Sequence, residues 1–188
     1  MLPREFYSKD TVNVAKDLLG KRIIRKIRGV ELSGIITETE AYKHKDDPAS
    51  HAFTKITERN KVMFGEVGIA YVYFTYGMHY CFNIVAKHPK TAAGAVLIRG
   101  IEPERGIEMM QKNRKRITLE NLTDGPAKLA QALEITKKQY GLDLTKKSDL
   151  YITEGIEKPK GIDAASRIGI RDAKDKLWNF KIKIRKEG

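Results

Sequence analysis

The first periodic pattern in the chain is helical. Between residues 8 and 19, apolar side chains recur at intervals of three and four residues, which places them on one face of a helix. These positions are Val12, Ala15, Leu18 and Leu19. Ser8 or Asp10 can cap the first turn of this helix, and Gly20 can end the last turn. We therefore expect a first helix over residues 8–19.

Strand-forming residues dominate the next stretch, residues 22–42, with a turn signal at Arg28-Gly29 in its middle. We expect two strands that meet at this turn. Glu38 and Glu40 stand among the strand formers near the end of the second strand. They share one face, because side chains two residues apart in a strand point the same way. The second strand therefore presents two carboxylates on one face.

The strongest alternating pattern covers residues 69–86, where even positions are mostly apolar and odd positions are mixed and polar. A hairpin around Gly77 matches the two faces only if paired residue numbers sum to an even value, which requires a loop of odd length. This register brings Tyr73 near Asn83 on the polar face and leaves Tyr76-Gly77-Met78 as an exposed tip. The aromatic residues of the hairpin that we assign to the core are Phe74, Tyr80 and Phe82.

Weaker signals predict the remaining elements. Asp47 before Pro48 is typical of the start of a short helix, which would carry His51, and Asp124 would cap a helix with Pro126 in its first turn.

We also expect a helical turn within 57–64, a strand at 94–103, a helix at Glu104–Lys115, and a last pair of strands near Leu150–Thr153 and Leu177–Ile184. Because strands and helices do not alternate regularly, the pattern predicts an α+β fold in a single domain over residues 1–188.

Composition and charge narrow the class of protein. The 188 residues are 41% hydrophobic, which is enough for a core, yet no window approaches the roughly 18 consecutive apolar residues of a membrane span. The N-terminus also lacks the apolar run of a signal peptide, so we expect a soluble, cytoplasmic protein. The net charge of +12 favours a polyanionic partner such as nucleic acid. The alternative is a Lys-rich surface that only keeps the protein in solution.

Cysteine and histidine give no sign of a metal or disulfide framework. Cys81 is the only cysteine, and the four histidines show no spacing typical of metal ligands. We expect no intrachain disulfide and no cysteine-rich metal site.

Glu40 is the first candidate for chemistry, because a carboxylate late in an apolar strand can act as a general base on water. The alternative is one partner of an ion pair on the sheet. Glu38 on the same face raises a further possibility, a glycosidase with two carboxylates. Their separation along the strand is about 6.5 Å and both point the same way, whereas two carboxylates that flank one bond usually come from different elements.

Aromatic side chains suggest a site for a planar ring. Tyr42, His51 and Tyr73 are suited to stacking on such a ring, although each could equally be structural. Tyr76 at the hairpin tip could enter a base stack or fold back onto the sheet. Arg99, near the end of an apolar strand, needs a partner if it is buried, and either Glu40 or a phosphate would serve.

Six motifs together resemble one enzyme family. In chain order they are ETEAY, DPASHAF, ERNKVMF, AYVYFTYGMHYCFNIV, LIRGIEP and GPAKLAQAL. This series resembles the 3-methyladenine DNA glycosylases of the alkyladenine type over most of the chain. The resemblance implies a DNA repair hydrolase without metal or cofactor, whose fold is a curved antiparallel β-sheet surrounded by helices.

The resemblance also implies roles for individual residues. Glu40 would deprotonate the attacking water, and Arg99 would hold that water and Glu40 in place. The residues implied to form the pocket for a flipped base are Tyr42, His51, Tyr73 and Asn83, of which Asn83 would exclude the exocyclic amine of guanine. Those implied to enter the duplex are Tyr76 and Met78, and those implied to contact the DNA backbone are Lys55, Arg59 and Lys128.

The chain departs from the family pattern at three places. Relatives usually carry Arg-Gly and a Pro where this chain reads TKITERN, so a DNA contact there would pass to Lys55 or change. Asn179 stands where relatives often have Arg, which puts a contact near the C-terminus in doubt. Gly100 follows Arg99 where Ala is usual.

The implied substrate is double-stranded DNA that contains an alkylated or deaminated purine. Hydrolysis of its N-glycosidic bond would leave an abasic site without strand cleavage, in a monomeric protein associated with the nucleoid. The alternative is a non-catalytic protein that binds damaged DNA or structured RNA on the same scaffold. That alternative explains the charge and the aromatic residues but gives Glu40 no role.

Overall fold

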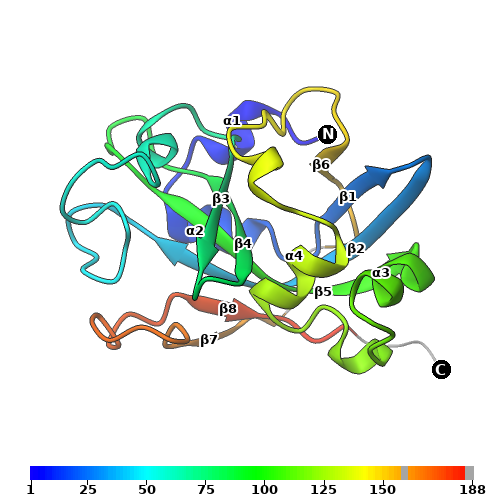
Figure 1. Cartoon of the computed structure of the whole chain (residues 1–188). Coiled ribbons are helices and arrows are strands. Elements are labelled where there is room, and N and C mark those ends of the chain that lie inside the picture. Colours follow the sequence, from blue (N-terminus) through cyan, green and yellow to red (C-terminus); the bar gives the residue numbers. More distant parts are fainter. Residues whose placement is uncertain (158–160, 185–188) are drawn as a thin grey trace.

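The computed structural model describes residues 1–157 and 161–184, and its centre is a curved antiparallel sheet. The strands in these ranges are β1 (Arg22–Ile27), β2 (Val30–Tyr42), β3 (Ala70–Thr75), β4 (His79–Val85), β5 (Ala95–Arg105), β6 (Leu150–Thr153), β7 (Asp163–Ala165) and β8 (Asn179–Lys181). Their order is β3-β4-β5-β2-β1-β6, and β8 pairs with both β2 and β7 (Figure 1). The predicted α+β fold with a curved antiparallel sheet is confirmed.

Short helices cover the sheet and close the core. The α-helices of the described residues are α1 (Arg4–Tyr7), α2 (Thr11–Asp17), α3 (Ile107–Asn113) and α4 (Pro126–Ala132), with 3-10 helices η1 (Lys61–Phe64), η2 (Leu119–Asn121) and η3 (Lys137–Gln139). The helix α2 packs against β2 and β5, and α4 packs against β4 and β5. The fully buried side chains that these contacts bring together include Leu18, Phe82, Ile98 and Leu129. Apolar burial of this kind is the main term that stabilises the fold.

Of the two helix caps predicted at the starts of α2 and α4, one is present and the other is not. Asp10 caps α2 as expected, because its side chain accepts a hydrogen bond from the backbone N–H of Val12. Asp124 does not cap α4, which begins at Pro126 after the cap residue Gly125. The carboxylate of Asp124 instead accepts a hydrogen bond from the Nζ of Lys128 at 2.8 Å. An ion pair one turn along the helix has replaced the expected capping bond.

The strand β2 joins the two halves of the sheet. Its first half pairs with β1 across the predicted turn at Arg28-Gly29, where both residues have positive φ. Its second half pairs with β8 and with β5, so that Glu40 lies opposite Asn179 on one side and Leu97 on the other. A carboxylate late in β2 is therefore enclosed by neighbouring strands on both edges.

The hairpin of β3 and β4 has the predicted register. Its paired residue numbers sum to an even value, as in Tyr71 with Asn83 and Tyr73 with Cys81, and the connecting loop has three residues. Tyr73 therefore lies diagonal to Asn83 on the same face. The assignment of Phe74 to the core is wrong, because Phe74 is 48% exposed and rests on Tyr80 with ring centroids 4.9 Å apart. This end of the hairpin projects beyond the elements that cover its apolar face.

The segment after β2 contains turns where a short helix that starts near Asp47 and carries His51 was predicted. The side chain of Asp47 does not cap a helix, because it binds Arg167 and the backbone N–H of Lys43. The predicted helical turn within 57–64 is present as η1. A long-range ion pair has therefore overridden the local signal of Asp47 before Pro48.

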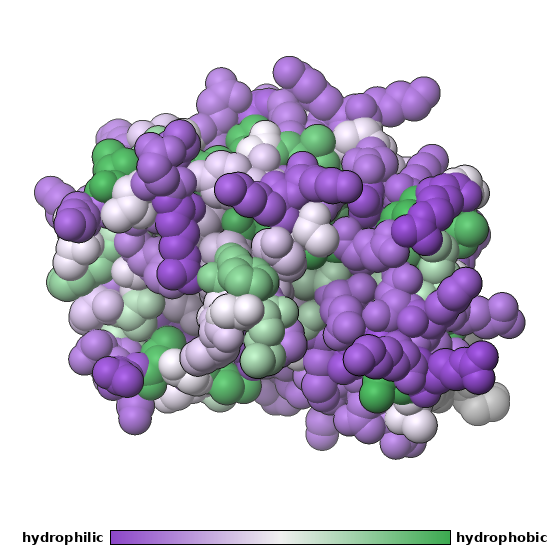
Figure 2. Space-filling model, in the orientation of Figure 1, coloured by the Kyte–Doolittle hydropathy of each residue, from purple (hydrophilic) through white to green (hydrophobic). Residues whose placement is uncertain are grey.

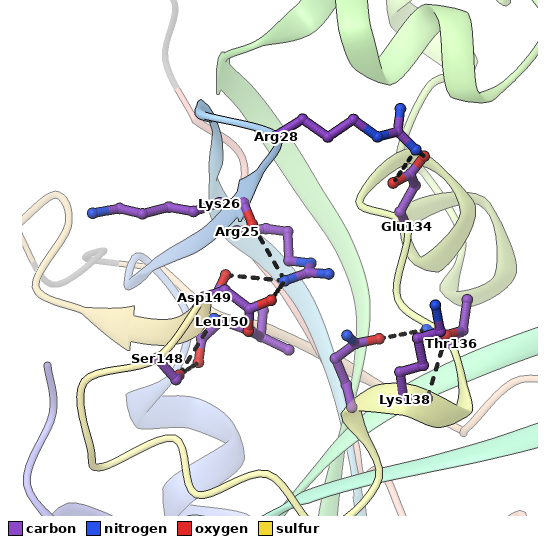
Figure 3. A network of polar contacts seen from close by, with 10 residues as sticks. Arg25, Lys26, Arg28, Glu134, Thr136, Lys138, Ser148, Asp149 and Leu150 are labelled. Atoms are coloured by element: carbon purple, nitrogen blue, oxygen red, sulfur yellow. Dashed lines mark hydrogen bonds and ion pairs between the residues drawn. The ribbon is translucent and has the colours of Figure 1, made fainter.

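The late strands β6 and β8 do not form a pair with each other. The strand β6 pairs with β1, where Arg25 donates to the side chain of Asp149 just before β6 (Figure 3). The strand β8 pairs with β2 and with the short, exposed β7, which the sequence did not predict. The strand β6 has its predicted range, whereas β8 covers only Asn179–Lys181 of the predicted Leu177–Ile184. Each strand closes a different part of the sheet.

The face of the molecule drawn in Figure 2 is mainly hydrophilic, in keeping with a net charge of +12. In residues 1–157 and 161–184, no helix has the length and apolar character needed to cross a membrane. The large apolar side chains that are exposed include Phe74, Tyr76 and Met78, all from the hairpin of β3 and β4. The end of this hairpin therefore presents three large apolar side chains to solvent.

Candidate active site

A cavity of about 280 Å³ opens where the hairpin meets β2 and β5. Its volume is close to the lower end, roughly 300 Å³, of pockets that bind small ligands, which suits one small planar group. The predicted site residues that line it are Tyr42, His51, Arg59, Tyr73, Tyr76, Asn83 and Arg99. The cavity thus brings together residues that are distant in the sequence, such as Tyr42 and Arg99, which are 57 positions apart.

One wall is an aromatic cluster around His51. The Nδ1 of His51 and the hydroxyl of Tyr71 are 2.8 Å apart, and the His51 and Tyr73 rings meet edge to face with centroids 4.7 Å apart. Burial against these rings lowers the pKa of His51 to about 4, and the nearby charge of Arg59 acts in the same direction. Burial also raises the pKa of Tyr73. The wall is therefore uncharged at neutral pH and presents flat faces to the cavity.

Arg59 is exposed on its loop, and its side chain also lines the cavity. Its guanidinium carbon is 4.7 Å from the centroid of the Tyr73 ring, and its charge is felt by both His51 and Tyr71. A guanidinium stacked on an aromatic face is a favourable cation–π contact. Arg59 thus covers the ring surface on which a planar ligand would stack.

The floor of the cavity is held by the backbone of the hairpin. The Nδ2 of the buried Asn83 donates to the carbonyl of Tyr71 at 3.1 Å, which fixes the orientation of the amide. Cys81 lies beside it, and burial raises the pKa of its thiol. Asn83 can therefore present a fixed polar edge to a ligand.

Glu40 lies directly behind this cavity and is fully buried. Its carboxylate accepts hydrogen bonds from the Tyr42 hydroxyl at 2.8 Å, from the backbone N–H of Ile168 at 2.7 Å and from the Nδ2 of Asn179 at 3.1 Å. The Nη1 of Arg99 stands 3.5 Å from its Oε2. Tyr42, Arg99 and Ile168 line the cavity, whereas Glu40 does not. Four donor groups thus fix the carboxylate, and three of the residues that supply them separate it from the cavity.

Arg99 pairs with both carboxylates of β2. Its Nε donates to Glu38 at 2.9 Å, the shorter of its two carboxylate contacts. Burial works to raise the pKa of Glu38, but hydrogen bonds from Asn179 and Arg99, together with the charges of Arg99 and Lys181, outweigh burial and lower it. Glu38 is therefore a partner of Arg99 and does not line the cavity. This geometry disfavours a glycosidase in which Glu38 and Glu40 flank one bond.

The hairpin tip stands at the mouth of the cavity. Tyr76 is 86% exposed and Met78 is 68% exposed, and of these two only Tyr76 lines the cavity. Tyr76 has a φ of 51° and Gly77 has a φ of 67°. A non-glycine residue in the left-handed region is strained, and such strain is concentrated at functional sites. A bulky aromatic ring is held outward here although glycine would fit the turn more easily.

The remaining predicted DNA contacts lie outside the cavity. Lys55 is exposed on the loop that leads to Arg59. Lys128 is engaged with Asp124. Both are on the surface, and neither lines the cavity.

Several residues of the site were not assigned to it from the sequence, among them Asp47, Arg167, Ile168 and Asn179. Asn179 stood out only as a departure from the family pattern, and its amide in fact bridges Glu38 and Glu40. Arg167 is one of 36 Lys and Arg residues, and nothing local distinguishes it from the others. Ile168 contributes through its backbone N–H, which any residue could supply.

Within residues 1–157 and 161–184, His, Cys, Asp and Glu side chains form no group of three or more that could hold a metal ion. The groups around the cavity are instead arranged as hydrogen-bond donors to a carboxylate and as flat aromatic surfaces.

Comparison with known proteins identifies one family. The family model of methylpurine-DNA glycosylase matches residues 5–186. A protein of Carboxydothermus hydrogenoformans named "Putative 3-methyladenine DNA glycosylase" is 49% identical over 187 residues, which cover 99% of this chain and 97% of that protein. Proteins with the same name are 45% identical in Clostridium acetobutylicum, over 97% of this chain and 94% of that protein, and 45% identical in Francisella tularensis, over 92% and 90%.

Proposed function

Because the chain belongs to the methylpurine-DNA glycosylase family and is a DNA glycosylase that hydrolyses N-glycosyl bonds, we propose that Glu40 activates the water that releases a damaged purine. The observation that carries this proposal is the buried Glu40 carboxylate, held by four donors directly behind an aromatic cavity. The proposed substrates are 3-methyladenine and 7-methylguanine, with hypoxanthine and ethenoadenine as neutral candidates.

The purine would leave the duplex and stack between Tyr42, His51 and Tyr73. Extruding a base costs a few kcal/mol, and stacking on aromatic side chains returns roughly 1–3 kcal/mol per base. Arg59 would have to leave the face of Tyr73, and the phosphate of the extruded nucleotide is a suitable new partner for its guanidinium. Asn83, with its amide fixed by the backbone, would exclude the exocyclic amine of normal guanine.

The attacking water would lie between Glu40 and Arg99. The 3.5 Å separation of the Arg99 Nη1 and the Glu40 Oε2 is longer than the 2.7–2.9 Å of a tight charge-assisted hydrogen bond. In the proposed arrangement, a water oxygen on the cavity side would contact both atoms. Glu40 would accept the proton as the water attacks the sugar carbon, while Arg99 holds the water and the carboxylate in place. An alkylated purine is cationic and therefore already a good leaving group.

The product would be an abasic site in an uncut strand. Cleavage of the strand by a glycosylase requires an amine that forms an imine with the sugar, and none of the described residues that line the cavity is a lysine. We infer a monofunctional enzyme. Strand scission without heat or alkali would contradict this inference.

The DNA would be held by charge and by the hairpin tip. The protein has a net charge of +12, and the cations proposed to displace counterions from phosphates near the cavity are Lys55, Arg59 and Lys128. The side chains proposed to enter the minor groove are Tyr76 and Met78. The proposed unit is a monomer that acts on double-stranded DNA in the cytoplasm, at the nucleoid.

The direct test is chromatography of the bases released from methylated and from deaminated duplex DNA. We expect free methylated purine from the first substrate, and the second shows whether hypoxanthine is also released. The Glu40→Gln variant is the matched control, because it changes only the proposed base. Methylated purine released at the same rate by both proteins would overturn the proposed mechanism.

Replacing Tyr76 by Ala is expected to weaken base extrusion by roughly 10-fold, since it removes a stacking contribution of about 1–3 kcal/mol. The change in 2-aminopurine fluorescence beside the lesion should be largely lost, while binding to undamaged duplex changes little. Phe74→Ala is the matched control, because Phe74 is an exposed aromatic residue of the same hairpin that does not line the cavity. Equal fluorescence changes in Tyr76→Ala and the wild type would contradict the role of Tyr76.

A further inference from the structure

The structure contains a second buried ion pair beside Glu40, formed by Arg167 and Asp47. Both side chains are fully buried, and the guanidinium binds the carboxylate with two nitrogens, Nη1 to Oδ2 at 2.6 Å and Nη2 to Oδ1 at 2.5 Å. The Nη1 of Arg167 also donates to the carbonyl of Ala41 at 2.9 Å. The two residues are 120 positions apart. The pair therefore joins the loop after β2 to the segment before β8.

The flat faces of the Arg167 guanidinium are also engaged. Its central carbon is 4.6 Å from the centroid of the Tyr42 ring and 5.2 Å from that of Trp178. Tyr42 donates its hydroxyl to Glu40. Arg167 therefore fixes the plane of the ring that holds one oxygen of Glu40.

Hydrogen bonds next to the ion pair also fix Glu40 and the loop that carries His51. Ile168, the residue after Arg167, donates its backbone N–H to the other oxygen of Glu40 at 2.7 Å. Asp47 accepts from the backbone N–H of Lys43, and its carbonyl accepts from the N–H of Ser50, one residue before His51. One ion pair thus sets the position of a donor to Glu40 and of the loop that carries the aromatic wall.

Stability alone is a poor reason for such a pair. Two charges buried in a protein lose their hydration, and an apolar pair of similar volume is often equally stable. The Nε of Arg167 is buried without a hydrogen-bond partner, which adds to the cost. A lysine could supply the charge but neither the paired hydrogen bonds nor the stacked plane. What this pair supplies is therefore a fixed geometry of hydrogen bonds and stacking, rather than stability.

We propose that Arg167 and Asp47 are positioning residues for the glycosylase reaction. They act through Tyr42 and the backbone N–H of Ile168 to hold the Glu40 carboxylate at the angle needed for attack. This proposal rests on the proposed role of Glu40. Neither residue touches the substrate, so their loss should slow the chemical step more than it weakens binding.

The test compares the rate of the chemical step with lesion binding in two variants of the full chain. The first is Arg167→Lys, which keeps the charge. The second is the double variant Asp47→Leu with Arg167→Met, which removes both charges and fills the space with apolar atoms. We expect the single-turnover rate of base release to fall by roughly 10- to 100-fold in both, because misplacement by about 1 Å can cost that much. The dissociation constant for lesion-containing duplex should change by no more than about 3-fold.

A matched control separates positioning from stability. The largely buried side chain of Arg25 in β1 pairs with the half-exposed Asp149 just before β6 (Figure 3), and neither residue lines the cavity. Arg25→Lys should lower the melting temperature but leave the rate per folded molecule unchanged. The double variant is expected to melt close to the wild type, so that its slow reaction cannot be attributed to unfolding. Rates are therefore compared at a temperature where circular dichroism shows each variant to be folded.

The outcomes distinguish this proposal from the one on which it rests. If Glu40→Gln releases base as fast as the wild type, the role of Glu40 fails. If Glu40→Gln is slow but the folded double variant and Arg167→Lys react like the wild type, the positioning role fails. Equal losses in rate and in lesion binding would also overturn it, because they would show a general defect of the cavity.

Discussion

Replacing Glu40 by Gln should lower the single-turnover rate of base release by roughly 10²–10⁴-fold, the usual contribution of a general base. Glutamine is almost isosteric with glutamate, so the side chain can stay in its buried position behind Tyr42 and Arg99. Its amide cannot take a proton from water. Lesion binding should remain within about 3-fold of the wild type, because Glu40 does not line the cavity. Electrophoretic titration of a lesion-containing duplex, beside chromatography of the released base, measures both quantities.

Glu38→Gln is the matched control, two residues earlier on the same face of β2. Glu38 contacts Arg99 and Asn179 but does not line the cavity, so this variant should retain most of the rate. A result with Glu40→Gln fully active would remove Glu40 from the mechanism. A result in which both variants lose activity equally would instead favour a reaction that needs the two carboxylates together.

The parts of this site that the sequence predicted are those set by local periodicity. The two-residue period of a strand predicted that Glu38 and Glu40 share one face, and the amide of Asn179 indeed donates to both. The same period fixed the register of the hairpin and put Tyr73 and Asn83 on one face. These relations follow from the backbone alone and need no knowledge of distant residues.

The parts that were missed depend on contacts between distant segments. Asp47 before Pro48 is a sound helix signal, but the carboxylate is taken by Arg167, which comes 120 residues later. The partners of Arg99 were predicted as Glu40 or a phosphate, whereas Glu38 makes the shorter contact. No periodicity in a single sequence shows which arginine will be buried against which carboxylate. The charge network around Glu40 therefore needed three-dimensional coordinates.

Removing the cation that these carboxylates share should have the second large effect. Arg99→Met leaves Glu38 and Glu40 buried without their arginine, and breaking a buried ion pair typically costs about 3–5 kcal/mol of unfolding free energy. Asn179 still donates to both carboxylates, which places the expected loss toward the lower end of that range. Urea unfolding at pH 7 measures it. Arg105→Met on the same strand is the control, because its pair with Glu31 is exposed and should contribute no more than about 1 kcal/mol.

The dependence of this loss on pH identifies its cause. The lowered pKa of Glu38 means that the folded protein favours the charged carboxylate. The stability from this carboxylate is fully present above 4.5, its ordinary pKa, and is lost as the pH falls through its pKa in the folded protein. A protonated carboxyl group needs no arginine. The gap in unfolding free energy between wild type and Arg99→Met should therefore be largest at neutral pH and shrink in acid. A gap that stays constant with pH would show that lost packing of the arginine stem, and not the uncompensated carboxylates, destabilises the variant.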